Sequence, residues 1–305
     1  WLWANLATAY GMLIAFPLQG YSVTSIIFST LSIFVSYAFA IRFWRDLNAL
    51  AIQPPAFLWF KAALVFNAIS SIGAFSLAFM MANKMAHQDW YLGAVYFFLH
   101  FQYNGWFFFG LMGLLYLNLQ DHLPYAVLRR IFWIFALACV PAYFLSALWM
   151  PIPAWVYALV VMAAFMQVFA WGWLLRLIWQ NPSSRLQNMA AASRILISLS
   201  AVALTAKLLL QLGSTIPALS QLAFGFRPVV IGYLHLVLLG VQGAHHVVGA
   251  GDEGADGQAA HRPGGEAKST PPRPGCFRPR PPDQKGADDK ADGAEAQPHP
   301  ACQLA

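Results

Sequence analysis

The scarcity of charge over the first 248 residues constrains this chain more than any other feature. Up to Val248 there are three acidic residues, all aspartates, and eleven basic ones, for a net charge of +8. A water-soluble domain carries roughly a quarter charged residues. A stretch this poor in charge cannot present a soluble surface, so we expect lipid to surround it.

Apolar runs of near-membrane length fill the same stretch. Crossing a bilayer takes about 20 apolar residues, and we identify eight candidate runs, at residues 2–18, 23–44, 57–81, 91–119, 128–149, 154–179, 190–212 and 228–241. Their length and their apolar character on every side favour helices over strands. The fold class predicted for residues 1–248 is therefore an all-α polytopic transmembrane bundle of about eight spans. Pro141 falls inside the fifth run and should kink it.

The basic residues alternate between connectors in a way that predicts orientation. Most lie around the connectors after the second, fourth and sixth runs: Arg42, Arg45, Lys61, Arg129, Arg130, Arg176, Arg185 and Arg194. The positive-inside rule places these connectors in the cytoplasm. We therefore expect a multi-pass protein of a bacterial inner membrane with a cytoplasmic C-terminal tail. Its partners would be the lipid bilayer and other subunits of a membrane complex. The basic residues have no nucleic-acid-binding spacing.

The two ends of the chain differ from the expected bundle. Residues 249–305 are rich in Gly, Pro, Ala and mixed charge, with a net charge of −2. Such a composition predicts disorder, because too little apolar surface is available to offset the ordering entropy. This tail is either a native cytoplasmic segment or a frameshift product, and its abrupt start within the eighth run favours the second. Because Trp1 begins in mid-hydrophobic sequence, we also expect the membrane domain to be N-terminally truncated.

Ionisable side chains inside apolar runs are the candidate functional residues, because they are costly in lipid. His100, His235 and Lys207 lie roughly 8–15 Å below the same predicted boundary, at 1.5 Å of rise per residue. Tyr103 and Asn104 share the helix face of His100. Two histidines at equal depth predict axial ligation of a haem iron by His100 and His235. Tyr103, Asn104 and Lys207 would then contact the haem or its propionates.

Each of these residues also has a simpler interpretation. A single histidine inside a membrane bundle often makes a hydrogen bond between helices, and this applies to His100. Lys207 could extend its ammonium to the membrane interface. The three cysteines, Cys139, Cys276 and Cys302, have no metal-binding spacing, and Cys139 is interpreted as a small buried residue.

Several stretches resemble a known family. They are Ala4-Asn5-Leu6 with Tyr10-Gly11-Met12-Leu13-Ile14 and Gln19-Gly20-Tyr21, the run Phe28-Ser29-Thr30-Leu31-Ser32-Ile33-Phe34-Val35, the run Tyr96-Phe97-Phe98-Leu99-His100-Phe101-Gln102-Tyr103-Asn104-Gly105-Trp106-Phe107, and residues 135–150. Together they resemble a family of uncharacterised multi-pass bacterial membrane proteins, over most of residues 1–243. That family is distantly similar to the catalytic subunit of haem–copper oxidases, the group that includes nitric oxide reductase.

The resemblance implies haem held by histidines in the outer third of the bilayer. His100 and His235 lie at that depth, and each begins a His-x-x-x-x-Gly pattern. The chain departs from the active oxidases in having no adjacent histidine pair securely within a run and no His-x-x-x-Tyr. The resemblance therefore does not extend to oxygen or nitric oxide reduction.

Three functions follow as expectations. The first is a haem-binding, oxidase-like membrane protein in electron transfer or gas sensing. The second is a transporter of a small polar solute, which the internal polar layer and the proline-broken connectors favour. The third is a structural subunit of a membrane complex. No phosphate-binding glycine loop or Ser-His-Asp arrangement indicates a soluble enzyme, and no catalytic residue is assigned.

Overall fold

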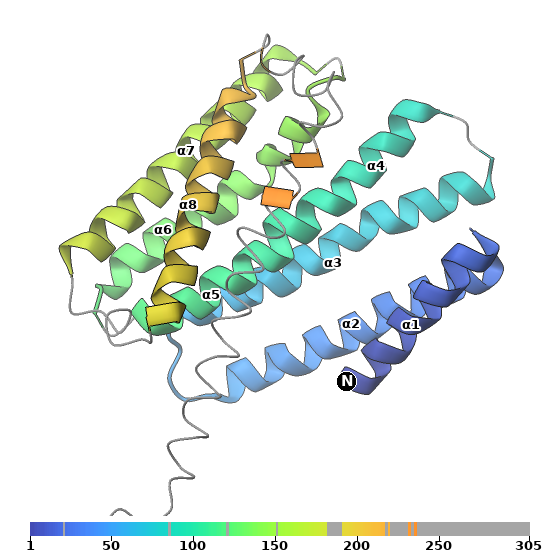
Figure 1. The fold of residues 1–305 in the computed structure, drawn as a ribbon, viewed down its shortest axis with the longest axis horizontal. Coiled ribbons are helices and arrows are strands. Elements are labelled where there is room, and N and C mark those ends of the chain that lie inside the picture. The colour runs from blue at the N-terminus through green and yellow to red at the C-terminus, as the bar shows by residue number, and fades with distance from the viewer. Residues whose placement is uncertain are drawn as a thin grey trace, which may run out of the picture. The chain divides into compact units, whose positions relative to one another are not determined.

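The computed structural model describes residues 1–20, 22–84, 87–119, 122–150, 152–181 and 191–216, together with positions 219, 231, 232, 235 and 236. All of these belong to the compact unit Trp1–His261. The described residues form helices and their connections, without a strand (Figure 1). The predicted all-α fold is thus confirmed for this part of the chain, while the tail at 249–305 lies outside it.

The helices follow one another with short connections. In chain order they are α1 (Leu2–Gln19), α2 (Val23–Ala49), α3 (Pro55–Ala82), α4 (Gln88–His100), the π-helix η1 (Phe101–Phe107), α5 (Phe108–Leu119), α6 (Tyr125–Cys139), the 3₁₀-helix η2 (Pro141–Ala147), α7 (Ala154–Gln180) and α8 (Ala191–Gly213). The local sequence explains where some of these helices begin. The Ser22 hydroxyl accepts from the amide of Ser25 at 3.4 Å before α2, and Pro55 occupies the first position of α3.

Four helices are long and apolar enough to cross a membrane: α2, α3, α7 and α8. A fifth candidate is the pair formed by α6 and η2, which is bent by 41°. This bend confirms the kink predicted at Pro141. The predicted number of about eight spans is not confirmed. The run at 91–119 is interrupted by η1, and α1 is not among the candidate membrane spans. Most of the run at 228–241 lies outside the described residues.

The core is an aromatic cluster around Trp59 of α3, which has no exposed surface. Its ring centroid lies 5.0 Å from that of Phe109 on α5 and 5.2 Å from that of Phe132 on α6. The rings of Tyr116, Phe135 and Phe108 lie at 5.0, 5.9 and 6.2 Å from Trp59. Large, rigid rings at this junction hold α3, α5 and α6 together through extensive buried area.

A small residue allows α3 and α4 to pack closely. A Cβ atom at Gly73 would lie 2.7 Å from both the Ala94 carbonyl oxygen and the Phe98 amide nitrogen. Because those neighbours are backbone atoms, they cannot move aside for a side chain. Close approach at small residues is the usual packing mode of helices in lipid. It positions α4, and therefore His100 at its end, against α3.

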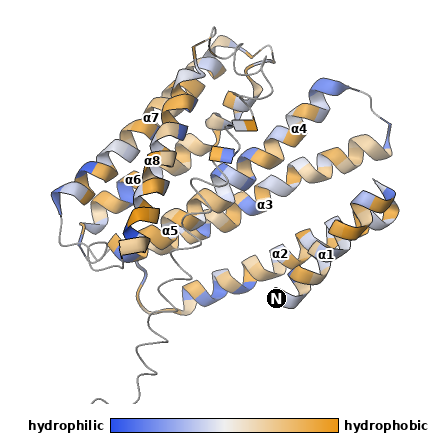
Figure 2. Cartoon of the chain, viewed as in Figure 1, coloured by the Kyte–Doolittle hydropathy of each residue, from blue (hydrophilic) through white to orange (hydrophobic). Residues whose placement is uncertain are grey.

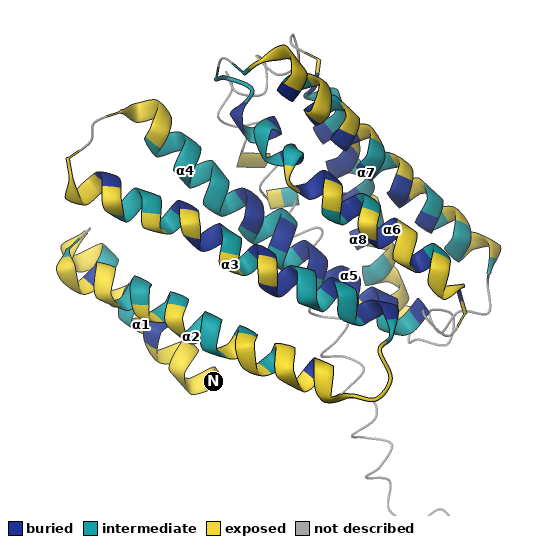
Figure 3. Cartoon of the chain, turned by 180° about the vertical axis from the view of Figure 1, so that it is seen from behind, coloured by how far each residue is buried: buried dark blue, intermediate teal, exposed yellow. Residues whose placement is uncertain are grey.

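The outer faces of the helices are apolar (Figures 2 and 3). Phe34 on α2, Phe79 on α3, Phe165 on α7 and Trp179 near the end of α7 are all exposed. Soluble monomers rarely expose large contiguous apolar patches. The membrane character predicted from the sequence is therefore matched by the distribution of apolar side chains over the bundle surface.

Candidate functional site

His100 lies where α4 passes into the π-helix η1, and its side chain is buried. Its Nε2 atom is 2.9 Å from the Cys139 carbonyl oxygen, and its Nδ1 atom is 3.3 Å from Nδ2 of Asn104. A carbonyl can only accept, so Nε2 carries the proton and donates to it. Nδ1 then accepts from the Asn104 amide. Both ring nitrogens are satisfied by groups of the protein.

The π-helix η1 spans Phe101–Phe107 and begins directly after His100. Such widened turns are rare and occur frequently at functional sites. Asn104 lies in the middle of η1, and its side-chain amide contacts His100. Its backbone carbonyl accepts a hydrogen bond from the Cys139 thiol at 3.7 Å. Asn104 thus joins η1 to the last residue of α4 through its side chain and to the last residue of α6 through its backbone.

The Cys139 carbonyl can accept from His100 because the α-helix ends there. In a continuous helix the Tyr143 amide would bond to this carbonyl. After Pro141 the chain forms the 3₁₀-helix η2, and the Tyr143 amide bonds instead to the Val140 carbonyl at 3.2 Å. The Tyr143 hydroxyl donates to the Gly93 carbonyl of α4 at 3.0 Å. The broken segment α6–η2 is therefore joined to α4 on both sides of the break.

Lys207 lies on the buried face of α8, in a stripe with Ser200, Ala203, Leu204 and Gln211. Only 5% of its surface is exposed. Its Nζ atom is 5.9 Å from the ring centroid of Phe108. Among the described residues, neither a carboxylate nor a hydrogen-bond acceptor contacts it.

Further polar contacts join α7 and α8 near Lys207. Gln211 donates from its side-chain amide to the side-chain oxygen of Gln167. The indole N–H of Trp171 donates to the Thr205 hydroxyl at 2.9 Å. These side chains come from interior faces of helices with span-like length. Together with His100, Asn104 and Lys207, they form a polar layer inside an otherwise apolar bundle.

The structure brings together part of the predicted site. His100 and Asn104 are in contact, whereas the contact of Lys207 is with the ring of Phe108 on α5. The Tyr103 ring instead stacks on Phe107, with centroids 6.2 Å apart. His235 is exposed, and its Nδ1 atom is 2.8 Å from the carbonyl of Ile231 in its own segment. Within the described residues no contact joins His235 to His100.

Two residues of this site were not identified from the sequence. Cys139 was interpreted only as a small buried residue, and Tyr143 was not considered. The available signal was Pro141, because a proline inside a helix kinks or breaks it. What the sequence did not reveal is that the Cys139 carbonyl, which no longer accepts from the Tyr143 amide, faces a histidine 39 positions earlier in the chain.

The described arrangement does not fit a haem iron on His100. Neither ring nitrogen has a free lone pair directed at a ligand site, since Nε2 donates to Cys139 and Nδ1 accepts from Asn104. Two glycines of this segment, Gly105 and Gly113, do not leave room for a flat ligand either. A Cβ at Gly105 would contact Phe66, and one at Gly113 would contact Phe60, both from α3. No group of three metal-ligating side chains occurs among the described residues.

Comparison of the chain with protein-family models, with curated proteins and with solved structures gave no match, so the assignment of function rests on its own residues.

Proposed function

We propose that this chain is a multi-pass integral membrane protein that transports a small anionic solute, with Lys207 as the residue that binds the anion. The observation that carries this proposal is the burial of the Lys207 ammonium without a carboxylate partner among the described residues. An ionisable residue inside a membrane bundle is by default a functional residue.

The energetics of Lys207 favour an anionic ligand. Removing an ammonium from water costs roughly several kcal/mol even after the protein relaxes. A cation–π contact such as the one with Phe108 returns about 0.5–2 kcal/mol. A neutral histidine and a thiol add little attraction. A carboxylate or inorganic anion beside Nζ would supply the missing charge, so solutes bearing such a group are the expected substrates.

The helix breaks beside Lys207 favour transport over static binding. Transporters commonly place their solute at discontinuous helices. Here the α6–η2 pair bends by 41°, and η1 interrupts the helix that contacts it. The two irregular segments are joined through His100 and Cys139. A local rearrangement of these contacts would change the surroundings of Lys207 without unfolding the rest of the bundle.

Proteoliposome uptake tests this proposal. The full chain is reconstituted, and uptake of chloride, phosphate and acetate is followed separately. We expect one of these probes to enter faster than in empty vesicles, and Lys207→Met to abolish that excess. Lys61→Met is the matched control, because the Lys61 Nζ also lies over an aromatic ring, at 5.7 Å from the Trp44 centroid, but on a solvent-accessible part of α3. Uptake that is equal in Lys207→Met and wild-type vesicles would contradict the proposal.

A haem-binding, oxidase-like protein is the second candidate, in line with the family resemblance. The observation in its favour is that His100 and Asn104 lie together, and the buried Lys207 ammonium has no carboxylate partner among the described residues and could pair with a propionate. It requires the His100 ring to leave the Cys139 carbonyl. An oxidised-minus-reduced visible spectrum of protein expressed with haem supply tests it, beside His100→Ala and His235→Ala. The absence of a Soret band would contradict haem binding. If the haem bands and the anion uptake by proteoliposomes were both absent, a structural subunit of a membrane complex would be favoured.

We further propose that the membrane domain crosses a bacterial inner membrane about eight times, with the tail in the cytoplasm. The charge distribution over the connectors supports this orientation. The segment from Gln88 to Leu119 supports an additional crossing, because α4, η1 and α5 follow one another without a connector.

A further inference from the structure

Exposed arginines gather at one end of α6, α7 and α8. Arg129 and Arg130 lie in the second turn of α6, Arg176 lies in the last turns of α7, and Arg194 lies in the first turn of α8. α6 and α8 begin at the end of the bundle where α7 ends (Figure 1). All four residues are exposed. They form a positively charged surface, which we call the arginine patch.

The arginine patch has no acidic partner among the described residues. The described part of the chain contains two carboxylates, Asp46 and Asp89. Asp46 pairs with Arg42 at 3.2 Å on α2, and Asp89 lies in the first turn of α4. A surface of one charge without counter-charges attracts partners of the opposite charge. The patch therefore favours an anionic partner.

On α6 the arginines are continued by an exposed apolar strip. Trp133 follows Arg129 by four residues, and Leu137 follows Trp133 by four more, so the three share one helix face and are spaced about 6 Å apart along the axis. Trp133 and Leu137 are 51% and 64% exposed, so no described helix covers them. We call the surface formed by Arg129, Arg130, Trp133 and Leu137 the α6 face.

The polar and apolar ends of the α6 face point in opposite directions along the helix. The guanidinium carbon of Arg129 lies 5.9 Å from the ring centroid of Tyr125, the first residue of α6. This contact directs the guanidinium toward the start of the helix and away from Trp133. The face thus presents guanidinium, then indole, then aliphatic side chain, which is the order of layers from the headgroups to the acyl chains of a membrane.

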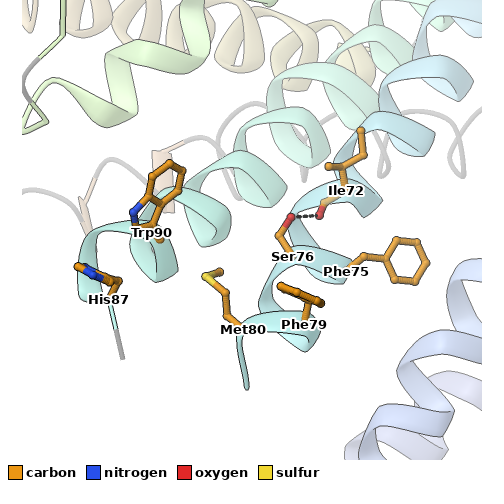
Figure 4. A pocket seen from close by; sticks show the side chains of 7 residues that line it. All are labelled: Ile72, Phe75, Ser76, Phe79, Met80, His87 and Trp90. Atoms are coloured by element: carbon orange, nitrogen blue, oxygen red, sulfur yellow. Dashed lines mark hydrogen bonds between the residues drawn. The ribbon is translucent and has the colours of Figure 1, made fainter. Parts of the chain in front are cut away.

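The open pocket between α3 and α4 lacks this combination of charge and apolar surface. Phe75 and Phe79 line it from α3, and Trp90 lines it from α4 (Figure 4). The Ser76 hydroxyl in its wall donates to the Ile72 carbonyl at 2.7 Å. None of the described residues that line it is a lysine or an arginine. Apolar contact alone does not distinguish one headgroup from another, whereas the α6 face defines the chemistry of its partner.

We propose that the α6 face binds an anionic phospholipid, phosphatidylglycerol, with its phosphate at Arg129 and Arg130 and an acyl chain along Trp133 and Leu137. The planar N–H groups of a guanidinium match the oxygens of a phosphate, and basic residues at the cytoplasmic ends of membrane helices bind anionic headgroups. An acidic protein segment would satisfy the arginines but leave the apolar strip uncovered. A zwitterionic lipid carries an ammonium beside its phosphate, which the arginine patch repels.

Native mass spectrometry of the full chain tests the site. The protein is purified in neutral detergent, delipidated, and titrated with phosphatidylglycerol or phosphatidylethanolamine of the same acyl chains. We expect the wild type to bind phosphatidylglycerol roughly tenfold more tightly, and Arg129→Gln with Arg130→Gln to bind both lipids equally. Arg42→Gln with Arg45→Gln is the matched control, because it removes the same two charges from exposed positions of α2. This control should keep the preference of the wild type.

Equal binding of the two lipids by the wild type would overturn the proposal. An equal loss of preference in both double variants would overturn it as well, because net charge alone would then explain the effect. If the variant with both α6 arginines replaced does not fold, the single variants Arg129→Gln and Arg130→Gln take its place, and each should lose part of the preference.

The apolar half of the α6 face is tested with Trp133→Gln, which keeps both arginines. We expect this variant to bind phosphatidylglycerol several-fold more weakly than the wild type. Unchanged binding would mean that the arginines attract anions without an acyl contact, and would overturn the lipid assignment. The α6 face is exposed, whereas Lys207 is buried against Phe108. The outcome of these titrations is therefore independent of the uptake experiment.

Discussion

At the scale of single residues, His100 and Lys207 show two different ways to bury a polar side chain. His100 satisfies both ring nitrogens through the Cys139 carbonyl and the Asn104 amide. Lys207 has an aromatic ring beside its ammonium but no acceptor among the described residues. The first arrangement stabilises the contact between η1 and α6. The second leaves a buried positive charge without a counter-charge among the described residues. An anion-binding site needs such a charge, whereas a purely structural contact does not.

Replacing Lys207 by methionine should therefore stabilise the protein in the absence of substrate. Replacing buried charge by an apolar side chain of similar volume is often stabilising, by about 1–4 kcal/mol. We expect a higher midpoint of thermal unfolding in detergent for Lys207→Met, and an unchanged midpoint for Lys61→Met. A lower midpoint for Lys207→Met would mean that the ammonium has a structural partner.

Replacing His100 by phenylalanine should destabilise the fold. The ring volume is retained, but the buried Cys139 carbonyl loses its donor, which costs about 1–3 kcal/mol. The Asn104 amide, which is half-buried, loses its acceptor as well. Tyr103→Phe is the control. Tyr103 lies on η1, directly after the helix of His100, and its hydroxyl makes no hydrogen bond to a described residue. Denaturant or thermal unfolding should separate the two variants, and equal stability would contradict a structural role for the His100 bonds.

At the scale of helices, irregular geometry marks the places where neighbouring helices meet. The π-helix η1 and the break at Pro141 lie opposite one another and are joined by the His100–Cys139 bond. Close packing of α3 on α4 depends on a residue without a side chain at Gly73. The regular parts of the helices supply length and apolar surface, and the irregular parts determine which side chains meet.

Gly73→Ala should weaken the contact between α3 and α4. The added methyl group would meet backbone atoms of α4 at 2.7 Å, and overpacking of this kind costs about 1–3 kcal/mol. Gly110→Ala on α5 is the control, since no atom lies within 4 Å of its Cβ position. There the gain in helix propensity should be neutral or stabilising. Thermal unfolding of both variants measures the difference, and similar losses in both would refute this account of Gly73.

At the scale of the whole molecule, the described helices expose apolar side chains and bury a polar layer. This distribution is the one that a lipid environment favours, because the surrounding solvent cannot hydrogen-bond. The proposed anion site belongs to the interior, where Lys207 of α8 lies over the ring of Phe108 of α5.

Reporter fusions test the membrane orientation. A fusion after Leu50 follows α2, and a fusion after Lys84 follows α3. We expect green fluorescent protein to fluoresce at the first position and alkaline phosphatase to be active at the second, because Arg42, Arg45 and Lys61 flank the first connector and Lys84 is the single basic residue of the second. The reverse pattern would invert the proposed orientation. The same side at both positions would contradict a crossing by α3.

The sequence by itself determined the all-α class, the membrane-like helices and the kink at Pro141. Each depends on local chemistry: long apolar runs require helices in lipid, and proline lacks the amide that continues a helix. It also predicts a similar depth for His100, His235 and Lys207, because rise per residue is constant along a helix. Haem ligation by His100 and His235 remains a prediction.

Only the tertiary structure decided what these residues contact. Depth along a helix says nothing about the direction in which a side chain points around it. That direction depends on helix rotation, on the extra residue in η1 and on the close approach at Gly73, all of which result from packing between helices far apart in the sequence. For this reason the partner of His100 is the carbonyl of Cys139, and the neighbour of Lys207 is the ring of Phe108.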